Sequence, residues 1–518
     1  MNKALLLLFL FPLGVQGAGF YELGDEIRSS ARTEAKIEGD FRLRGELLYN
    51  LDLDRGLTPS GEPLFAVPLG DPAAQTLTHA DMRLRTDLQV VVPQASLAVK
   101  ARFDLLDNLA LGSLPDAPPA ATFSQRPPAE AIRLKRAWAE ALLPFGVLLA
   151  GRQGSHWGLG MLSHGGDCAD CESGDAADRI ALVTAIAGHL WALAYDFSAT
   201  GPWAERRFSG RAIDLDPTDD LRTVTFAIMR WHSPMSLARR LDAGRNTLDY
   251  GLSLMWRWQE KDVPASYLPL ARPPELDGAQ VVGRQLQVLG ADVWLRWIGP
   301  RGRVEAEGAL LWGRIGQASL VPGLELKEGL EMLQWGAALE SEFRLGQRLL
   351  VGLDAGVASG DPAPGFGARP LANQLPAQPG DLDGPQADYP RDVRVDNFRF
   401  HPDYHIDRIL FREIIGTVTD AVYLKPRLRA LLLEVGTGKL EAGLSAVCSF
   451  AMRAESAPGD SRPLGVELDP TLEYRDGVGF SAALEYAWLF PLSGLDNPRD
   501  GLTARSAQLL RFRLSYVF

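Results

Sequence analysis

The sequence contains no block of lysines and arginines, and its formal net charge is -12 over 518 residues. Proteins that bind nucleic acids show a basic footprint, either overall or in one segment. The 52 glycines and 35 prolines follow no repeat, so they punctuate turns and do not form a collagen-like or low-complexity chain. A nucleic-acid partner is therefore excluded.

Long apolar runs are also missing. Beyond residue 20 no stretch of 18 residues is apolar and largely uncharged, which excludes ordinary transmembrane helices. Because only helices and closed barrels satisfy their backbone hydrogen bonds in lipid, two classes remain. The chain is either a secreted soluble protein or a membrane-spanning β-barrel.

Catalytic and metal-binding signatures are scarce as well. The seven histidines lie mainly in loops or at strand edges, and the chain has no Gly-x-Ser-x-Gly elbow. We therefore expect no enzyme activity, no cofactor and no metal. One low-probability exception is a calcium site formed by loop carboxylates, since Ca²⁺ takes several oxygen ligands, although acidic loops are usually only solvated. These carboxylates are Asp381, Asp383, Asp388 and Asp392.

The N-terminus carries a targeting pattern. A positive start, an apolar run from Ala4 to Leu13 and small residues near Gly17 predict a cleavable signal peptide over 1–17. A retained anchor is less favoured, because about 20 apolar residues are needed to span a bilayer. We expect a periplasmic segment over 18–35 and one barrel domain over 36–518.

An alternation of period two supports the barrel. From Ile37 to Leu53 the odd positions are mostly apolar and the even ones mostly ionisable. Successive strand side chains point to opposite faces, so this segment has one apolar and one charged face. Seventeen further segments repeat the pattern. They are 82–92, 97–105, 131–143, 146–155, 178–188, 189–199, 220–232, 246–261, 285–298, 303–317, 330–345, 348–359, 420–434, 438–452, 465–476, 478–490 and 505–518.

The connections alternate between very short turns and long polar loops, and the long loops include 55–78, 156–177 and 360–405. Outer-membrane barrels show this asymmetry, with short periplasmic turns and long extracellular loops. The prediction is all-β: a single antiparallel transmembrane barrel of about 18 strands, with 16 as the alternative. The segment 405–420 is either a strand extension or a helical piece folded into the mouth or lumen.

The chain also resembles known proteins. The final strand LLRFRLSYVF, with Leu514, Tyr516 and Phe518 at alternate positions, is similar to the C-terminal assembly signal of bacterial outer-membrane proteins. The segments 38–56, 105–113, 151–180 and 398–426 resemble an uncharacterised family of large outer-membrane barrels. That family is more remotely similar to the 18-stranded alginate-export porins. The resemblance implies a bacterial outer-membrane location, with lipid and the assembly machinery as partners.

If apolar faces meet lipid, the charged faces line the lumen, because an Arg or Lys at the bilayer midplane costs about 2 to 4 kcal/mol. Closure next to strand one should bring basic residues together on one wall and leave acidic residues on the opposite wall. We expect a transverse field that favours anionic or polar solutes; the alternative is that these ions only pair with neighbours. The basic wall comprises Arg42, Arg44, Arg83, Arg85, Lys100, Arg102, Arg133, Lys135, Arg511 and Arg513. The acidic wall comprises Glu305, Glu307, Glu340 and Glu342.

The three cysteines give one further expectation. Cys168 and Cys171 lie close together in a long loop, and in an oxidising compartment a local disulfide is favoured over a redox or metal site. The function that fits best is a porin or exporter for small hydrophilic solutes, anionic ones included, or for a polysaccharide. The alternatives are an outer-membrane hydrolase and a structural or adhesive barrel that acts through its loops.

Overall fold

The computed structural model describes Ile27 and most of the chain from residue 32 onward. The described ranges are 32–71, 74–111, 132–201, 203–206, 212–263, 281–319, 324–368, 377–382 and 387–518. The predicted signal peptide over 1–17 and most of the segment 18–35 lie outside them.

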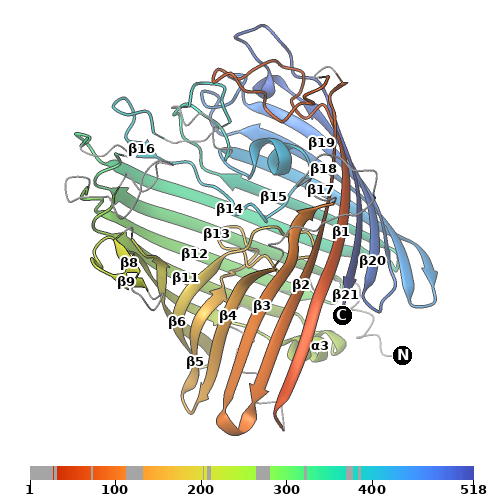
Figure 1. The fold of residues 1–518 in the computed structure, drawn as a ribbon. Helices are drawn as coiled ribbons and strands as arrows, with labels where there is room; N and C mark the ends of the chain where they lie inside the picture. The colour runs from red at the N-terminus through yellow and green to blue at the C-terminus, as the bar shows by residue number, and fades with distance from the viewer. Residues whose placement is uncertain are drawn as a thin grey trace, which may run out of the picture.

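The described residues form a closed antiparallel barrel of eighteen spanning strands, which confirms the predicted count over the alternative of 16 (Figure 1). Neighbouring strands pair in chain order, and the last strand pairs with the first to close the sheet. The strands are β1 (Glu34–Tyr49), β2 (Thr76–Val92), β3 (Leu97–Ala110), β4 (Ile132–Leu143), β5 (Gly146–Gly154), β6 (Ala176–Ile186), β7 (His189–Ala199), β10 (Leu221–Arg230), β11 (Thr247–Gln259), β12 (Leu286–Gly299), β13 (Gly302–Ile315), β14 (Leu330–Leu345), β15 (Leu349–Ala358), β17 (Ala421–Val435), β18 (Gly438–Ala451), β19 (Pro463–Arg475), β20 (Phe480–Pro491) and β21 (Ala507–Val517).

A few short elements are not part of the barrel wall. Strands β8 (Ala204–Arg206) and β9 (Ala212–Asp214) pair only with each other, and β16 (Arg394–Val395) pairs with β14. The helical pieces are η2 (Pro93–Ala95), α3 (Pro234–Asp242), the π-helical turn η6 (Leu410–Ile415) and η7 (Ser493–Leu495). Within the described residues, no helix combines the length and apolarity needed to cross a bilayer.

The two faces of the wall differ as the alternation predicts. On β21 the side chain of Arg511 is 1% exposed, whereas Phe512 and Tyr516 are 45% exposed. Phe518 is also exposed, and Leu514 is half-buried. The exposed apolar side chains point away from the lumen, where lipid replaces water as their surroundings.

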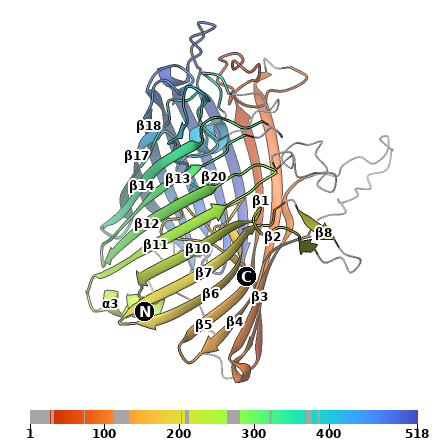
Figure 2. The same ribbon diagram turned by 90° about the vertical axis from the view of Figure 1, so that its left-hand side faces the viewer.

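The short and long connections lie at opposite ends of the barrel (Figure 2). The one long connection on the short-turn side, between β10 and β11, contains α3. Ser233 caps this helix by accepting a hydrogen bond from the Ser236 backbone N–H, and Leu237 and Leu241 pack against Ile298. The apolar pair, one helical turn apart, therefore fixes the helix against the end of β12.

The segment 405–420 is the helical alternative and not a strand extension. It contains η6, whose Leu410, Phe411, Ile414 and Ile415 side chains are all buried in the largest apolar cluster of the described residues. The next strand, β17, begins only at Ala421. These apolar side chains are spaced to lie on one face of a helix, and in this turn they are buried together. In a strand the same side chains would point to two opposite faces.

Glycine is required at one point of the closing seam. The Gly39 backbone N–H donates to the Phe518 carbonyl, and the Gly39 carbonyl accepts from the Phe518 N–H, both at 3.0 Å. A Cβ on Gly39 would lie 2.4 Å from the Arg85 carbonyl oxygen and 2.7 Å from the Phe518 ring.

We therefore expect Gly39→Ala to destabilise the barrel by about 1 to 3 kcal/mol, as overpacking does, and to lower the urea midpoint of the refolded protein. Gly45→Ala is the matched control, because nothing lies within 4 Å of the added Cβ on the same strand. Equal midpoints for the two variants would show that the seam is not tightly packed at Gly39.

Candidate functional site

Two connections fold into the barrel. The β5–β6 connection (155–175), here called the cysteine loop, contacts opposite walls. Its Leu159, Gly160 and Leu162 backbone N–H groups donate to the Glu307 carboxylate on β13, at 2.5, 3.1 and 3.3 Å. At its other end the Ala169 and Cys171 carbonyls accept from Arg83 on β2. The loop therefore crosses the lumen.

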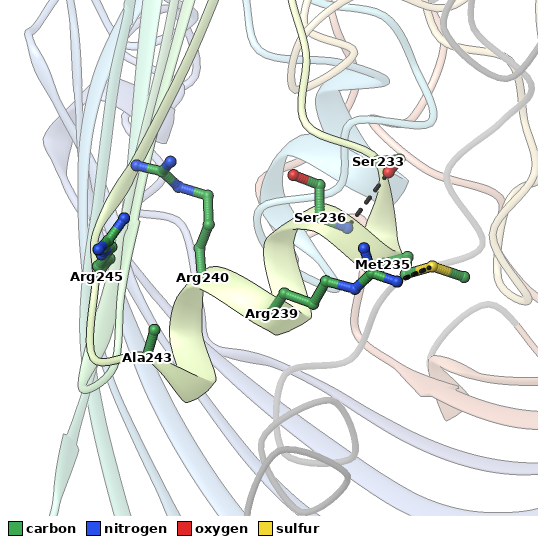
Figure 3. Close-up of a pocket in the computed structure, with 7 residues that line it drawn as sticks. All are labelled: Ser233, Met235, Ser236, Arg239, Arg240, Ala243 and Arg245. Atoms are coloured by element: carbon green, nitrogen blue, oxygen red, sulfur yellow. Dashed lines mark hydrogen bonds between the residues drawn. The ribbon is translucent and has the colours of Figure 1, made fainter.

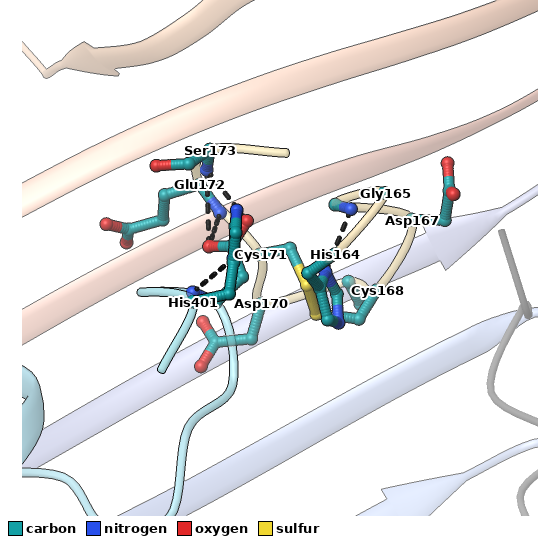
Figure 4. The surroundings of a disulfide bond; sticks show 12 residues. His164, Gly165, Asp167, Cys168, Asp170, Cys171, Glu172, Ser173 and His401 are labelled. Atoms are coloured by element: carbon teal, nitrogen blue, oxygen red, sulfur yellow. Dashed lines mark hydrogen bonds between the residues drawn. A yellow bond between two sulfur atoms is a disulfide. The ribbon is translucent and has the colours of Figure 1, made fainter. Parts of the chain in front are cut away.

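The β15–β17 connection (359–420), here called the long loop, lies against the cysteine loop. The His401 N–H donates to the Met161 carbonyl at 2.7 Å, and the Asp403 carboxylate accepts from the N–H groups of Glu172 and Ser173 (Figure 4). The Glu467 carboxylate on β19 accepts from three successive N–H groups at the start of η6. Carboxylates thus hold both loops by their backbones.

The basic wall lies on the inner face, and its cations are paired. The ion pairs are Arg42 with Asp81 (3.1 Å), Arg44 with Asp81 (2.7 Å), Arg83 with Asp40 (3.1 Å), Arg85 with Asp104 (2.8 Å), Lys100 with Glu140 (2.9 Å), Arg102 with Asp87 (2.6 Å), Arg133 with Asp107 (3.4 Å), Lys135 with Asp107 (2.8 Å), Arg511 with Glu46 (2.5 Å) and Arg513 with Glu485 (3.2 Å). Of these, Arg133 is the exception in burial, because its side chain is 71% exposed.

Sequence reasoning missed Arg136. The β3–β4 register shifts between Arg102 and Phe103, and a β-bulge of this kind breaks the alternation of faces. The Arg136 side chain is buried and bonds to Asp167 (3.0 Å) and to the Gly165 carbonyl. The local alternation gives no sign of this bulge, because with regular period two Lys135, and not Arg136, is the residue expected to point inward.

Asp170 is the point where the barrel seam and both loops meet. Its carboxylate lies 2.5 Å from Arg412 of the long loop, 3.4 Å from Arg511 on β21, 3.5 Å from Arg44 and 3.8 Å from Arg42 on β1. Burial alone would raise the pKa of Asp170, but the guanidinium groups of Arg412 and Arg511 hold the pKa well below its ordinary value. We call this group the Asp170 cluster.

Glu172 extends the cluster. Its carboxylate contacts Arg44 and lies 3.4 Å from Arg412. Against the opposing effect of burial, these two cations lower the pKa of Glu172 to about 2. The cysteine loop therefore stays anionic at neutral pH, and it covers the arginines that were expected to face solutes. These arginines bind the loop and neighbouring carboxylates, as the pairing alternative describes, and the effect of the basic wall on solutes stays a prediction.

Cys168 and Cys171 form a disulfide on either side of Asp170 (Figure 4). Cys448 on β18 is a free thiol. His164 and Asp403 lie near Cys171, but the Cys171 sulfur is already bonded. The His164 Nδ1 accepts from the Gly166 N–H at 2.9 Å, and burial lowers the pKa of this imidazole to about 3. Because the Cys171 sulfur is in the disulfide, the trio lacks its thiolate ligand.

The acidic wall is placed opposite the basic one, and its members have different roles. Glu307 holds the cysteine loop, and Glu305 accepts from the Trp294 indole N–H at 2.8 Å. Glu340 pairs with Arg303 (3.2 Å), and Glu342 pairs with Arg427 (2.8 Å). Arg303 also lies 3.2 Å from Glu305, so three of the four carboxylates have a cation partner and Glu307 is held by backbone N–H groups.

The three described carboxylates among those considered for calcium do not form a cluster of ligand atoms. Asp381 accepts from the Ser60 and Gln378 backbone N–H groups, and Asp388 pairs with Arg391 at 2.9 Å. Asp392 accepts from the Arg394 N–H, and Asp383 lies outside the described residues. The described members are thus occupied by hydrogen bonds and an ion pair.

Sequence reasoning also missed a basic cluster on α3 and the turn that follows it. Arg239, Arg240 and Arg245 line a shallow cavity of about 380 Å³ at the short-turn end of the barrel (Figure 3). Among the residues that the structure describes, none of the three forms an ion pair with a carboxylate. A charge count for each connection could have found this cluster.

A closed antiparallel barrel with an apolar outer surface and an ionised interior defines an outer-membrane type of β-barrel. No family model and no curated protein matches the chain. Crystal structures of two Pseudomonas aeruginosa proteins are similar to it at low identity. OccK11 (OpdR) aligns at 12% identity and a TM-score of 0.46, covering 93% of this chain and 96% of that one. OccK9 (OpdG) aligns at 13% identity and a TM-score of 0.47, covering 94% and 98%.

A loop-deletion form of OmpT, an outer membrane protein of Vibrio cholerae, aligns at 9% identity and a TM-score of 0.35, covering 94% of this chain and 99% of that one. At this similarity none of these proteins transfers a function to the chain. The strand register of the barrel itself establishes the fold, and the resemblance to alginate-export porins stays a prediction.

The Asp170 cluster can be tested by removing one charge. We expect Asp170→Asn to destabilise the cysteine loop by about 3 to 5 kcal/mol, because several buried guanidinium groups lose their shared carboxylate. Amide exchange within 160–175 should accelerate, and single-channel conductance should rise. Asp178→Asn is the control, since the Asp178–Arg152 pair is about half exposed on both sides. Unchanged exchange in Asp170→Asn would show that the other contacts suffice.

Asp420, at the end of the long loop, makes stability depend on pH. Burial raises its pKa to about 7, against the hydrogen bonds from Ser456 and the Arg453 N–H. Because its folded pKa is raised, the stability it contributes is complete below the unfolded pKa of about 3.9 and is lost as the pH rises through about 7.

Asp420→Asn mimics the protonated form, since the amide can accept from the Arg453 N–H and donate to Ser456. We expect this variant to raise the melting temperature at pH 8.5, to leave it nearly unchanged at pH 5, and so to flatten its pH dependence. Glu325→Gln, at an exposed loop position, should retain the slope of the original protein. If the melting temperature of Asp420→Asn still falls with rising pH as in the original protein, other groups cause the pH dependence.

Proposed function

We propose that the protein is an outer-membrane channel for small hydrophilic solutes. The observation that carries this proposal is the inner face of the closed barrel, which carries ionised side chains on most strands, with an apolar cluster on inner positions of β5, β6, β7 and β10. An eighteen-stranded barrel is wide enough for an aqueous path unless loops obstruct it. The mixed charges of the wall favour polar solutes over apolar ones.

The two inward loops support a small solute over a polysaccharide. The cysteine loop reaches from β2 to β13, and the long loop is tied to it and to β19. A polymer would have to displace loops that are held by buried ion pairs. Small solutes need only the space beside them.

The charge distribution also bears on selectivity. The expected anion preference rested on an open basic wall, but those cations are bonded to carboxylates and to carbonyls of the cysteine loop. Positive charge without ion pairing remains on α3, at the short-turn end. We infer that any anion preference originates there, because unpaired charges at a pore mouth focus the field.

The alternatives have less support. A hydrolase needs a nucleophile within hydrogen-bonding reach of a base. Among the described residues, the histidine rings bond to Asp81, Asp249 and the Tyr250 hydroxyl, and none bonds to a serine side chain. An adhesive role would rest on the long extracellular connections, which would leave the ionised lumen without a purpose.

Planar-bilayer recordings and liposome swelling test the channel. We expect refolded protein to conduct and to admit small neutral solutes while excluding oligosaccharides. A triple change of Arg239, Arg240 and Arg245 to Ser should shift the reversal potential toward cation preference. An equivalent change of Arg152, Arg391 and Arg505, which belong to exposed ion pairs, should shift it less. Absence of conductance in all preparations would reject the channel.

A further inference from the structure

One part of the lumen is left open beside the long loop, which contributes Arg408 to its lining. A cavity of about 320 Å³ lies along the inner face of β13 to β19, between the acidic wall and the next strands. Cavities of this size hold small organic molecules. Five basic and four acidic side chains line it, so its walls carry nearly balanced charge.

Most of these ions are already satisfied by one another. Arg427 bonds to Glu342 at 2.8 Å, to Asp354 at 3.0 Å and to the Ser341 carbonyl at 3.1 Å. Arg303 bonds to Glu340 and to Glu305, both at 3.2 Å. These groups have little remaining capacity for a ligand.

Asp469 is different. It is 1% exposed and lines the cavity from β19, and among the described residues its polar side-chain neighbours include Arg408 and the buried Glu467, with no donor at good hydrogen-bond geometry on either carboxylate oxygen. Its nearest cation is Arg408 at 3.6 Å, beyond hydrogen-bond length. A buried carboxylate without hydrogen bonds is costly, so a ligand that donates to it would recover that free energy.

Lys425 provides the opposite charge. It lines the same cavity from β17, and within 4 Å it forms no ion pair with a described carboxylate. One strand, β18, separates it from β19, so the two backbones lie roughly 10 Å apart by strand spacing. Ser445 of β18 is the register partner of Asp469 on one side and of Arg427 on the other, and it also lines the cavity.

We propose that this cavity is a binding site for a small zwitterion that carries an ammonium and a carboxylate group. The ammonium donates to Asp469, the carboxylate accepts from Lys425, and Ser445 can bond to either end. A singly charged solute gains one contact and leaves the other charge unmatched. This inference names the substrate class of the proposed channel and rests on that function.

Equilibrium binding to the refolded full-length protein tests the site without relying on conduction. Titration calorimetry in detergent would use 4-aminobutyrate, with butyrate and butylammonium as single-charge analogues. We expect the zwitterion to bind at least tenfold more tightly than either analogue. Asp469→Asn should reduce zwitterion binding to the level of butyrate, and Lys425→Gln should reduce it to the level of butylammonium.

Two matched variants control for general loss of charge. Glu473→Gln removes a carboxylate from β19, where Glu473 pairs with Arg475 at 2.7 Å, and Lys439→Gln removes a lysine from β18. Neither residue lines the cavity, so both variants should bind the zwitterion as the original protein does. Equal affinity for butyrate and 4-aminobutyrate, or unchanged binding in Asp469→Asn, would overturn the proposal.

Current recordings separate this proposal from the channel itself. If the protein conducts and 4-aminobutyrate neither binds nor blocks the current, the channel stands and the zwitterion site fails. If the zwitterion binds as expected but no preparation conducts, the channel fails and the cavity is a binding site only.

Discussion

The pairing of buried arginines is the constraint on which the interior depends. Taking an ion out of water costs several kcal/mol unless a partner of opposite charge and good geometry replaces the water. The Asp170 carboxylate meets this need for arginines from β1, β21 and the long loop together. The seam that closes the barrel and the loops that fill it therefore share one ionic cluster. Closure of the sheet brings Arg44 and Arg511 together, and this concentration of positive charge makes an inward acidic loop favourable.

The eighteen strands and their two faces could be predicted because one physical rule decides both. Lipid on the outside and charge on the inside impose period two, and the rule holds wherever strands are regular. It fails at the bulge beside Arg102, where the Arg136 side chain points inward although the alternation of the sequence does not predict it. It is also silent about loops, because Asp170 and Arg412 are 242 residues apart. The acidity of 167–175 was visible in the sequence, but only the folded chain shows which cations it meets.

Charge totals along the strands describe the lumen incompletely, because they leave out the charges and backbone groups of the loops. Counting inner-face residues predicts a basic and an acidic wall, and the structure has both. The field that a solute meets depends on which of these charges remain unpaired after the loops have folded in. On the basic wall the loop supplies carbonyls to Arg83 and Arg85 and carboxylates to Arg44 and Arg102. The charges that can act on a solute lie elsewhere, on α3 and around Lys425 and Asp469.

The same chemical device fixes both inward loops, and it determines where a solute can pass. Glu307 on β13 accepts three backbone N–H groups of the cysteine loop, and Glu467 on β19 accepts three of the long loop. A carboxylate that gathers successive N–H groups holds a segment by its backbone, with little dependence on the side chains that the segment carries. The wall between these two anchors, along β14 to β18, pairs its charges mainly with its own strands and leaves a cavity. The permeation path should therefore follow that wall, because there a solute competes with solvated and partly matched ions instead of displacing a loop.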